Sequence, residues 1–150
     1  MNEKDFAWVD VADLVPWIKN PRHNDQAVQP VAASIEEFGF GAPIVIQAKT
    51  NMIIAGHTRL KAAMRLGWSK VPCRILEITD RNAERLAIAD NKTNEIAQWD
   101  EEQLEEILGG FEPEELDNLG FSQDELDELT NHNNEPPPKT VEPPPKAFVN

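Results

Sequence analysis

A cluster of hydrogen-bond donors follows a short apolar run near the middle of the chain. Residues 51–68 read NMIIAGHTRLKAAMRLGW, so Gly56 separates the apolar run from His57, Thr58, Arg59 and Lys61. Glycine lets a strand turn sharply into a helix. The first turn of that helix presents backbone N–H groups and the positive end of the helix dipole, which favour an anion. These residues therefore predict an anion site. The alternative is that Thr58 only caps the helix while the cations form a solvated face.

Two further stretches carry polar groups that suit phosphate or metal binding. Residues 89–95 read ADNKTNE, and Asp90, Asn91, Asn94 and Glu95 are poor helix-interior residues as a group. We expect a helix to be interrupted there. Oxygen ligands of this type suit Mg²⁺ together with substrate phosphates, and the alternative is a fraying helix end. Arg22, in the early loop KNPRHN, could reach a phosphate or be an ordinary surface charge.

The elements that must position these residues alternate between strands and helices. Residues 6–17 predict a strand and a turn, and residues 28–38 predict a helix. Residues 42–47 and 51–56 predict two short strands that form a hairpin or lie as neighbours in the sheet. A helix follows from Thr58, then a strand over residues 70–78 and a helix from about Asp80. Expected core positions on the helices include Val28, Val31, Ile35, Phe38, Leu60, Ala63 and Met64. The pattern predicts an α+β fold, a small mixed sheet with flanking helices.

The net charge of −13 belongs to the end of the chain alone. Residues 1–98 carry 12 basic and 12 acidic side chains, whereas residues 99–150 carry Lys139 and Lys146 against 15 acids. We therefore divide the chain into a neutral domain at 1–98, an acidic helical extension at 99–130 and a proline-rich linker or tail at 131–150. An acidic extension suits partner binding and argues against a grip on nucleic-acid backbone.

The extension reads as short helices with narrow apolar stripes. Leu104, Ile107 and Leu108 form one stripe, and Pro113 stands at a predicted helix start. Ser122 and Glu125 have the spacing of a capping box. The repeat of Glu-Pro-Pro-Pro-Lys after residue 134 favours an extended spacer.

The lone cysteine and the tryptophans suit structural roles. Cys73 lies in an apolar strand, where a buried thiol is expected rather than a nucleophile. Trp8, Trp68 and Trp99 are expected to seal core edges, and Trp17, close to the Arg22 loop, is left open. No apolar run is long enough to cross a membrane, and the single cysteine fits a reducing, cytoplasmic compartment.

Taken together, these stretches resemble the ParB/sulfiredoxin superfamily, and specifically the ParB-like N-terminal domain. The matching residues are Asn20-Pro21-Arg22, the box at 56–62 and the acid-asparagine pair Asp90-Asn91, and the resemblance covers about residues 8–98. It implies a nucleotide pocket for CTP or ATP with Mg²⁺. Phosphate contacts would come from Arg22, Gly56, His57, Thr58, Arg59 and Lys61, and metal contacts from Asp90, Asn91 and Glu95.

The chain also departs from the family pattern. Partition proteins usually have an acid and an arginine where this chain has His57 and Thr58, and an arginine where it has Asn94. Loss of positive charge should weaken triphosphate binding or change the ligand. Sulfiredoxins place a catalytic cysteine at the position of His57, so sulfinic-acid reduction is not expected. No basic recognition helix follows residue 98, so chromosome segregation in the full sense is not expected either.

These observations support three functional interpretations. The first is a phage or mobile-element domain that binds a nucleotide, with DNA as a second candidate ligand. Its activity would be at most a weak nucleotidase or nuclease activity, and its ligand could make it a dimer. The second is a non-catalytic adaptor whose acidic helices dock a DNA methyltransferase or another phage protein, because the extension is similar to segments that join such domains to methyltransferases. The third is a small-molecule kinase, which would need a catalytic carboxylate such as Glu36 or Glu37.

Overall fold

The computed structural model describes residues 5–131, and a four-stranded mixed sheet forms the centre of its N-terminal part. The strands are β1 (Phe6–Asp10), β2 (Ile44–Gln47), β3 (Ile53–Ala55) and β4 (Lys70–Leu76), in the order β1-β4-β2-β3. β4 pairs antiparallel with β1 and parallel with β2, and β2 pairs antiparallel with β3. The expected hairpin and the expected small mixed sheet are confirmed.

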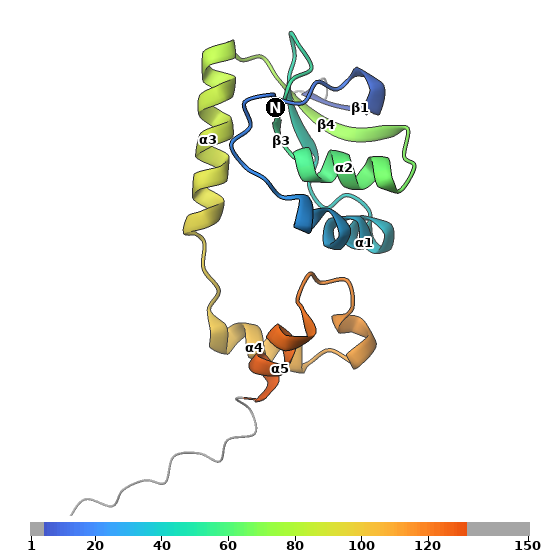
Figure 1. Cartoon of the computed structure of the whole chain (residues 1–150), viewed down its shortest axis with the longest axis vertical. Coiled ribbons are helices and arrows are strands. Elements are labelled where there is room, and N and C mark those ends of the chain that lie inside the picture. Colours follow the sequence, from blue (N-terminus) through green and yellow to red (C-terminus); the bar gives the residue numbers. More distant parts are fainter. Residues whose placement is uncertain (1–4, 132–150) are drawn as a thin grey trace, which may run out of the picture.

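Helices cover both faces of this sheet (Figure 1). On one face lies α2 (His57–Arg65), with α1 (Val28–Phe38) packed against it, and on the other lies α3 (Asp80–Ile96). Successive strand side chains point to opposite faces. Ile53 accordingly joins the core with Leu60 of α2, while Ile54 packs against Ala83 and Ala87 of α3.

Two expected core residues prove to be exposed. The exposed fractions of Phe38 and Met64 are 63% and 58%. Helix α2 lies between α1 and the sheet, so the fully buried Ala62 packs on α1 and the fully buried Ala63 packs on the sheet. The next residue, Met64, therefore points outward. The buried stripe of α1 ends at Ile35, so Phe38 lies beyond the contact with α2.

Helix α3 is continuous over the residues where an interruption was expected. Thr79 caps its start by accepting from the Asn82 backbone N–H at 3.3 Å. Near its end, the Thr93 hydroxyl donates to the Ala89 carbonyl at 3.0 Å, and Lys92 pairs with Glu95 at 3.3 Å. These local bonds satisfy polar groups within the helix, so the helix reaches Ile96 despite low intrinsic propensity.

The acidic extension forms a small helical unit beyond α3 (Figure 1). It consists of α4 (Glu101–Gly109), the 3₁₀ turn η4 (Pro113–Leu116) and α5 (Gln123–Asn131). Its expected stripe is correct for Leu104 and Leu108 but wrong for Ile107, which is 51% exposed. The expected capping box is present, with backbone-to-side-chain distances of 2.7 and 3.2 Å between Ser122 and Glu125. The predicted proline-rich segment lies outside the described residues.

Short 3₁₀ turns, η2 (Val11–Asp13) and η3 (Asp25–Ala27), flank the loop that carries Arg22.

Cys73 is 1% exposed and burial raises the pKa of its thiol to about 11, as expected for a structural thiol. Trp68 packs on Phe40 with ring centroids 5.3 Å apart. The expectation for Trp8 and Trp99 is wrong, since 61% and 68% of these residues are exposed. Over residues 5–131, no helix is both long enough and apolar enough to cross a membrane.

Candidate functional site

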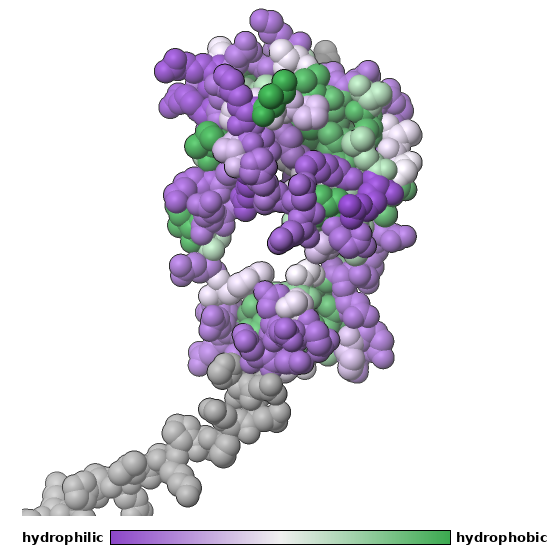
Figure 2. Space-filling view, in the orientation of Figure 1, coloured by the Kyte–Doolittle hydropathy of each residue, from purple (hydrophilic) through white to green (hydrophobic). Residues whose placement is uncertain are grey.

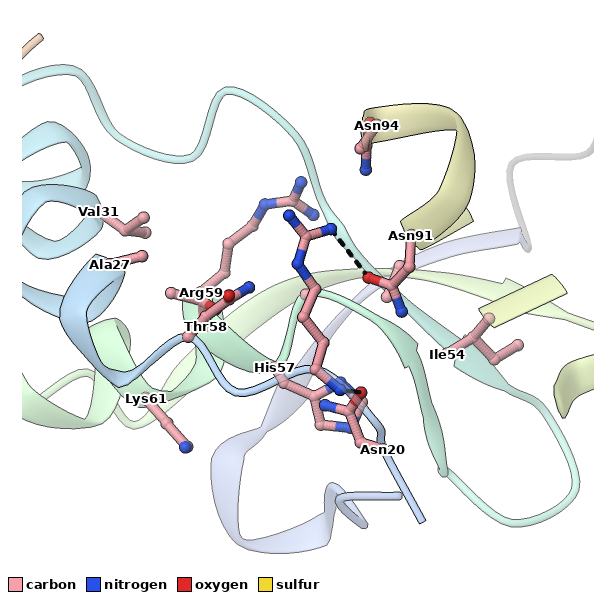
Figure 3. A pocket seen from close by; sticks show the side chains of 14 residues that line it. Asn20, Ala27, Val31, Ile54, His57, Thr58, Arg59, Lys61, Asn91 and Asn94 are labelled. Carbon is pink, nitrogen blue, oxygen red and sulfur yellow. Dashed lines mark hydrogen bonds between the residues drawn. The ribbon is translucent and has the colours of Figure 1, made fainter. Parts of the chain in front are cut away.

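A pocket of about 350 Å³ lies where four segments of the N-terminal part meet (Figure 3). These segments are the loop before α1 together with the start of α1, the end of β3, the first turns of α2 and the last turns of α3. The lining residues are Asn20, Arg22, Asn24, Ala27, Val31, Ile54, Ala55, Gly56, His57, Thr58, Arg59, Lys61, Asn91 and Asn94.

The glycine at the start of α2 sets the direction of that helix. Gly56 has φ 104° and ψ 23°, a left-handed conformation that other residues adopt at a cost. A Cβ atom there would lie 3.2 Å from Cγ1 of Ile44 and 3.3 Å from its Cα. No side chain caps α2, and the helix begins at His57, so the alternative in which Thr58 serves as the cap is wrong. The first turn of α2 therefore faces the pocket with its N–H groups free of a side-chain cap.

His57 ties the pocket to the loop on the opposite side. Its Nε2 accepts a hydrogen bond from the Trp17 backbone N–H at 3.1 Å, which requires an unprotonated Nε2. Burial, and then the nearby charge of Lys61, lower the pKa of His57. The imidazole is therefore a neutral positioning group at neutral pH, and its Nε2 is already engaged.

Two cations come from α2 itself. Arg59 is half-buried, and its Nη1 donates to the Pro43 carbonyl at 3.0 Å, which holds the guanidinium at the pocket wall. The Lys61 ammonium pairs with Asp25 at 2.8 Å and lowers the pKa of that carboxyl. Both members of this pair are largely exposed, so the pair contributes little to stability and the ammonium can exchange partners.

A third cation approaches from the early loop. The Asn20 side chain accepts from the Arg22 backbone N–H at 3.2 Å, which folds the loop around Pro21. The Arg22 Nη1 then donates to Oδ1 of Asn91 on α3 at 3.2 Å, across the pocket (Figure 3). Residues 69 positions apart in the sequence thus meet at one site.

The structure gathers most, but not all, of the predicted site residues. Arg22, Asn91 and residues 56–59 and 61 line the pocket, whereas Asp90 and Glu95 do not. Glu95 pairs with Lys92 instead. No aspartate or glutamate is among the pocket-lining residues, so the charge that the described side chains bring to it is positive or neutral. The assigned roles of these residues remain predictions.

Sequence reasoning missed several lining residues, and one of them left a signal. Asn94 was named in the polar group at 89–95 and as a departure from the family pattern but was assigned no contact, and it lines the pocket. Ala83, Ala87, Asn91 and Asn94 are spaced by four, four and three residues, and the two alanines are buried against the sheet. That spacing continues one helix face into the pocket. Asn20 belonged to the Asn-Pro-Arg match but was assigned no contact, and Asn24 gave no comparable signal.

Comparison with known proteins identifies one family. The family model of the ParB N-terminal domain matches residues 2–92. The probable chromosome-partitioning protein ParB of Vibrio cholerae is 35% identical over 94 residues, which are 59% of this chain and 32% of that protein. The probable plasmid-partitioning protein ParB of Thermus thermophilus is 31% identical over 99 residues, which are 65% of this chain and 32% of that protein. The chain thus spans about a third of the length of these relatives.

A solved structure agrees with this family assignment at the level of the fold. It is the C-terminally truncated chromosome-partitioning protein ParB from Caulobacter crescentus complexed with CTP-gamma-S. The TM-score is 0.69 at 20% sequence identity, covering 88% of this chain and 80% of that chain.

Proposed function

The chain belongs to the ParB N-terminal domain family, and from that membership we propose that its pocket holds the phosphate groups of a nucleotide, CTP or ATP. The observation that carries the proposal is the arrangement around Gly56. The left-handed turn aims the uncapped start of α2 into the pocket, and Arg59, Lys61 and Arg22 line the same space. A helix start with cations beside it binds phosphate through N–H donors and charge. The fold neighbour from Caulobacter crescentus, complexed with CTP-gamma-S, supports the choice of ligand class.

The test is direct binding of CTP, ATP, GTP and ADP to the wild type and to Arg59→Ala. Removing the guanidinium deletes a charge-assisted hydrogen bond, so we expect affinity for the preferred nucleotide to fall at least about tenfold. Arg65→Ala is the matched control, because Arg65 lies on the same helix but outside the pocket and donates to Gln29 at 3.0 Å. Equal loss in both variants would mean that only the net charge matters, and no binding by the wild type would refute the proposal.

We further propose that the domain takes part in DNA processing in a phage or mobile element. The partition proteins among its relatives support a link to DNA. In this role the domain would bind DNA, form a dimer that depends on the ligand, and have weak nucleotidase or nuclease activity. Phosphate release, duplex-DNA binding and sedimentation, each with and without nucleotide, test these three points. The family resemblance also implies Mg²⁺, with Asp90, Asn91 and Glu95 as its predicted ligands.

The second candidate function is a protein-binding adaptor, and the composition of the extension favours it. Residues 99–131 contain 13 acidic side chains and no lysine, arginine or histidine. Between their carboxylates, Trp99 and Phe121 line a shallow pocket with ring centroids 6.0 Å apart. Hydrophilic surface surrounds apolar side chains on this unit (Figure 2). A basic partner, such as a DNA methyltransferase, would relieve the charge repulsion. A melting temperature that responds to no nucleotide would favour this candidate.

The kinase interpretation has no support at the pocket. Neither Glu36 nor Glu37 is a lining residue, and Glu37 accepts from the Asn118 side chain at 2.8 Å. Asp25, the carboxylate next to the pocket, is paired with Lys61 at 2.8 Å, so neither predicted glutamate nor this aspartate stands free as a general base for a hydroxyl substrate.

A further inference from the structure

The donor set of the pocket does not fit the divalent cation that the family resemblance implies. Protein-bound Mg²⁺ is usually held by one or two carboxylates together with substrate phosphates. Among the described residues, no carboxylate lines the pocket, and no group of three or more His, Cys, Asp or Glu side chains could hold a metal ion. The oxygens that remain belong to a hydroxyl and to amides, which carry no formal charge.

The one predicted metal ligand in the pocket is already engaged by a cation. Oδ1 of Asn91 accepts from Arg22 at 3.2 Å, so a metal ion at this oxygen would have to share it with a guanidinium and would be repelled by its charge. Asp90 and Glu95 cannot replace it, because they do not line the pocket and Glu95 is paired with Lys92.

Arg22 has the chemistry to act in the place of the metal ion. A guanidinium is always charged and carries five donors in a planar fork, so one edge can bind Asn91 while the remaining donors bind phosphate oxygens. It reaches the pocket beside Asn91 of α3, whereas Arg59 and Lys61 come from α2. A phosphate between α3 and the start of α2 would then receive positive charge from both elements without a metal ion.

We infer that this pocket binds the phosphate groups of its nucleotide independently of a divalent cation, with Arg22, placed by Asn91, supplying the charge opposite α2. This inference rests on the proposed nucleotide-binding function and specifies how that site recognises its ligand. It has a consequence for affinity. Mg²⁺ neutralises part of the charge of a triphosphate, so a site lined by cations binds the free triphosphate at least as tightly as its Mg²⁺ complex.

The experiment measures the dissociation constants of CTP and ATP for the full chain in excess EDTA and in saturating Mg²⁺, at equal ionic strength. We expect the two values to agree within about threefold, or binding to be tighter in EDTA. Binding that is about tenfold or more tighter with Mg²⁺ would overturn the inference and leave the proposed function standing. Absence of binding under both conditions would refute the proposed function itself.

Two variants test the cause. Arg22→Ala should weaken binding in EDTA about tenfold, and Mg²⁺ should restore part of the loss because the missing charge is then supplied by the ion. Asn91→Asp keeps an acceptor for Arg22 but adds a carboxylate, so binding in EDTA should weaken and Mg²⁺ should now strengthen it. Arg81→Ala, an exposed arginine of α3 outside the pocket, is the control. Unchanged affinity in Arg22→Ala, or an Asn91→Asp protein as indifferent to Mg²⁺ as the wild type, would contradict the assignment.

Discussion

Replacing Gly56 with alanine should destabilise the fold more than the same change at either of two other glycines. At φ 104° alanine loses about 1–2 kcal/mol to left-handed strain. The new Cβ would also lie 3.2–3.3 Å from Ile44, which is fully buried in β2 and cannot move aside. Overpacking of this kind costs about 1–3 kcal/mol. The lower entropy of the unfolded chain offsets about 0.5–1 kcal/mol. The net loss for Gly56→Ala is therefore about 1–4.5 kcal/mol, with its centre at about 2.5 kcal/mol.

Two matched glycines separate the strain from the crowding. Gly67 has φ +78° and nothing lies within 4 Å of the point where an added Cβ atom would stand, so Gly67→Ala should lose about 0.5–1 kcal/mol from strain alone. Gly41 has open space and no left-handed φ, so Gly41→Ala should be neutral or slightly stabilising. Urea unfolding followed by tryptophan fluorescence gives the three free energies. If Gly56→Ala lowers the free energy of unfolding no more than Gly67→Ala does, the close approach of Ile44 in β2 does not require a glycine at the start of α2.

The remaining predictions concern two titrating groups. Because the folded-state pKa of His57 is lowered, the unfolded chain binds its proton first as pH falls below about 6.5, so stability should decrease from there towards the folded-state pKa. In His57→Gln, whose amide oxygen can still accept from the Trp17 N–H, the urea midpoint should change less between about pH 7 and 5.5 than it does in the wild type. His23→Gln, in the exposed loop, should keep the pH dependence of the wild type. Equal pH dependence in the two variants would contradict this reasoning. Burial raises the pKa of Cys73 to about 11, so stability should be lost as pH rises from about 9 towards 11. The native thiol should react with a thiol reagent only on unfolding, and rapid labelling of the folded chain would show that it is accessible.

Against the family pattern that the resemblance implies, the pocket keeps one positive charge fewer. His57 stands in place of an acid, and Thr58 and Asn94 in place of arginines, so one negative and two positive charges are replaced by neutral groups. Three cations, two of them partly engaged by Asp25 and Asn91, remain. The number of phosphates that bind should therefore depend on whether Lys61 leaves Asp25, a contact that salt weakens.

Local patterns determined the elements of this protein. Short β-rich runs predicted β2 and β3, helical spacing predicted α1 and α2, and glycine predicted the turn between strand and helix, because each depends on neighbours a few residues away. The capping box of α5 was correct for the same reason. The predicted interruption in α3 was wrong, because helix propensity is a weak guide and local bonds at Thr93 and Lys92 satisfy the polar groups of this segment.

Only the tertiary structure decided which of these residues form the site. Helical spacing lets Asn91 share a face with Asn94 or with Glu95, and the packing of α3 on β3 selects Asn94. The contacts of Trp17 with His57 and of Arg22 with Asn91 join positions 40 and 69 residues apart. Such distant pairs leave no local periodicity in the sequence, so folding alone brings them together. The sequence thus predicted the start of α2 as an anion site, and the fold determined that a guanidinium, that of Arg22, rather than a carboxylate lines the same pocket.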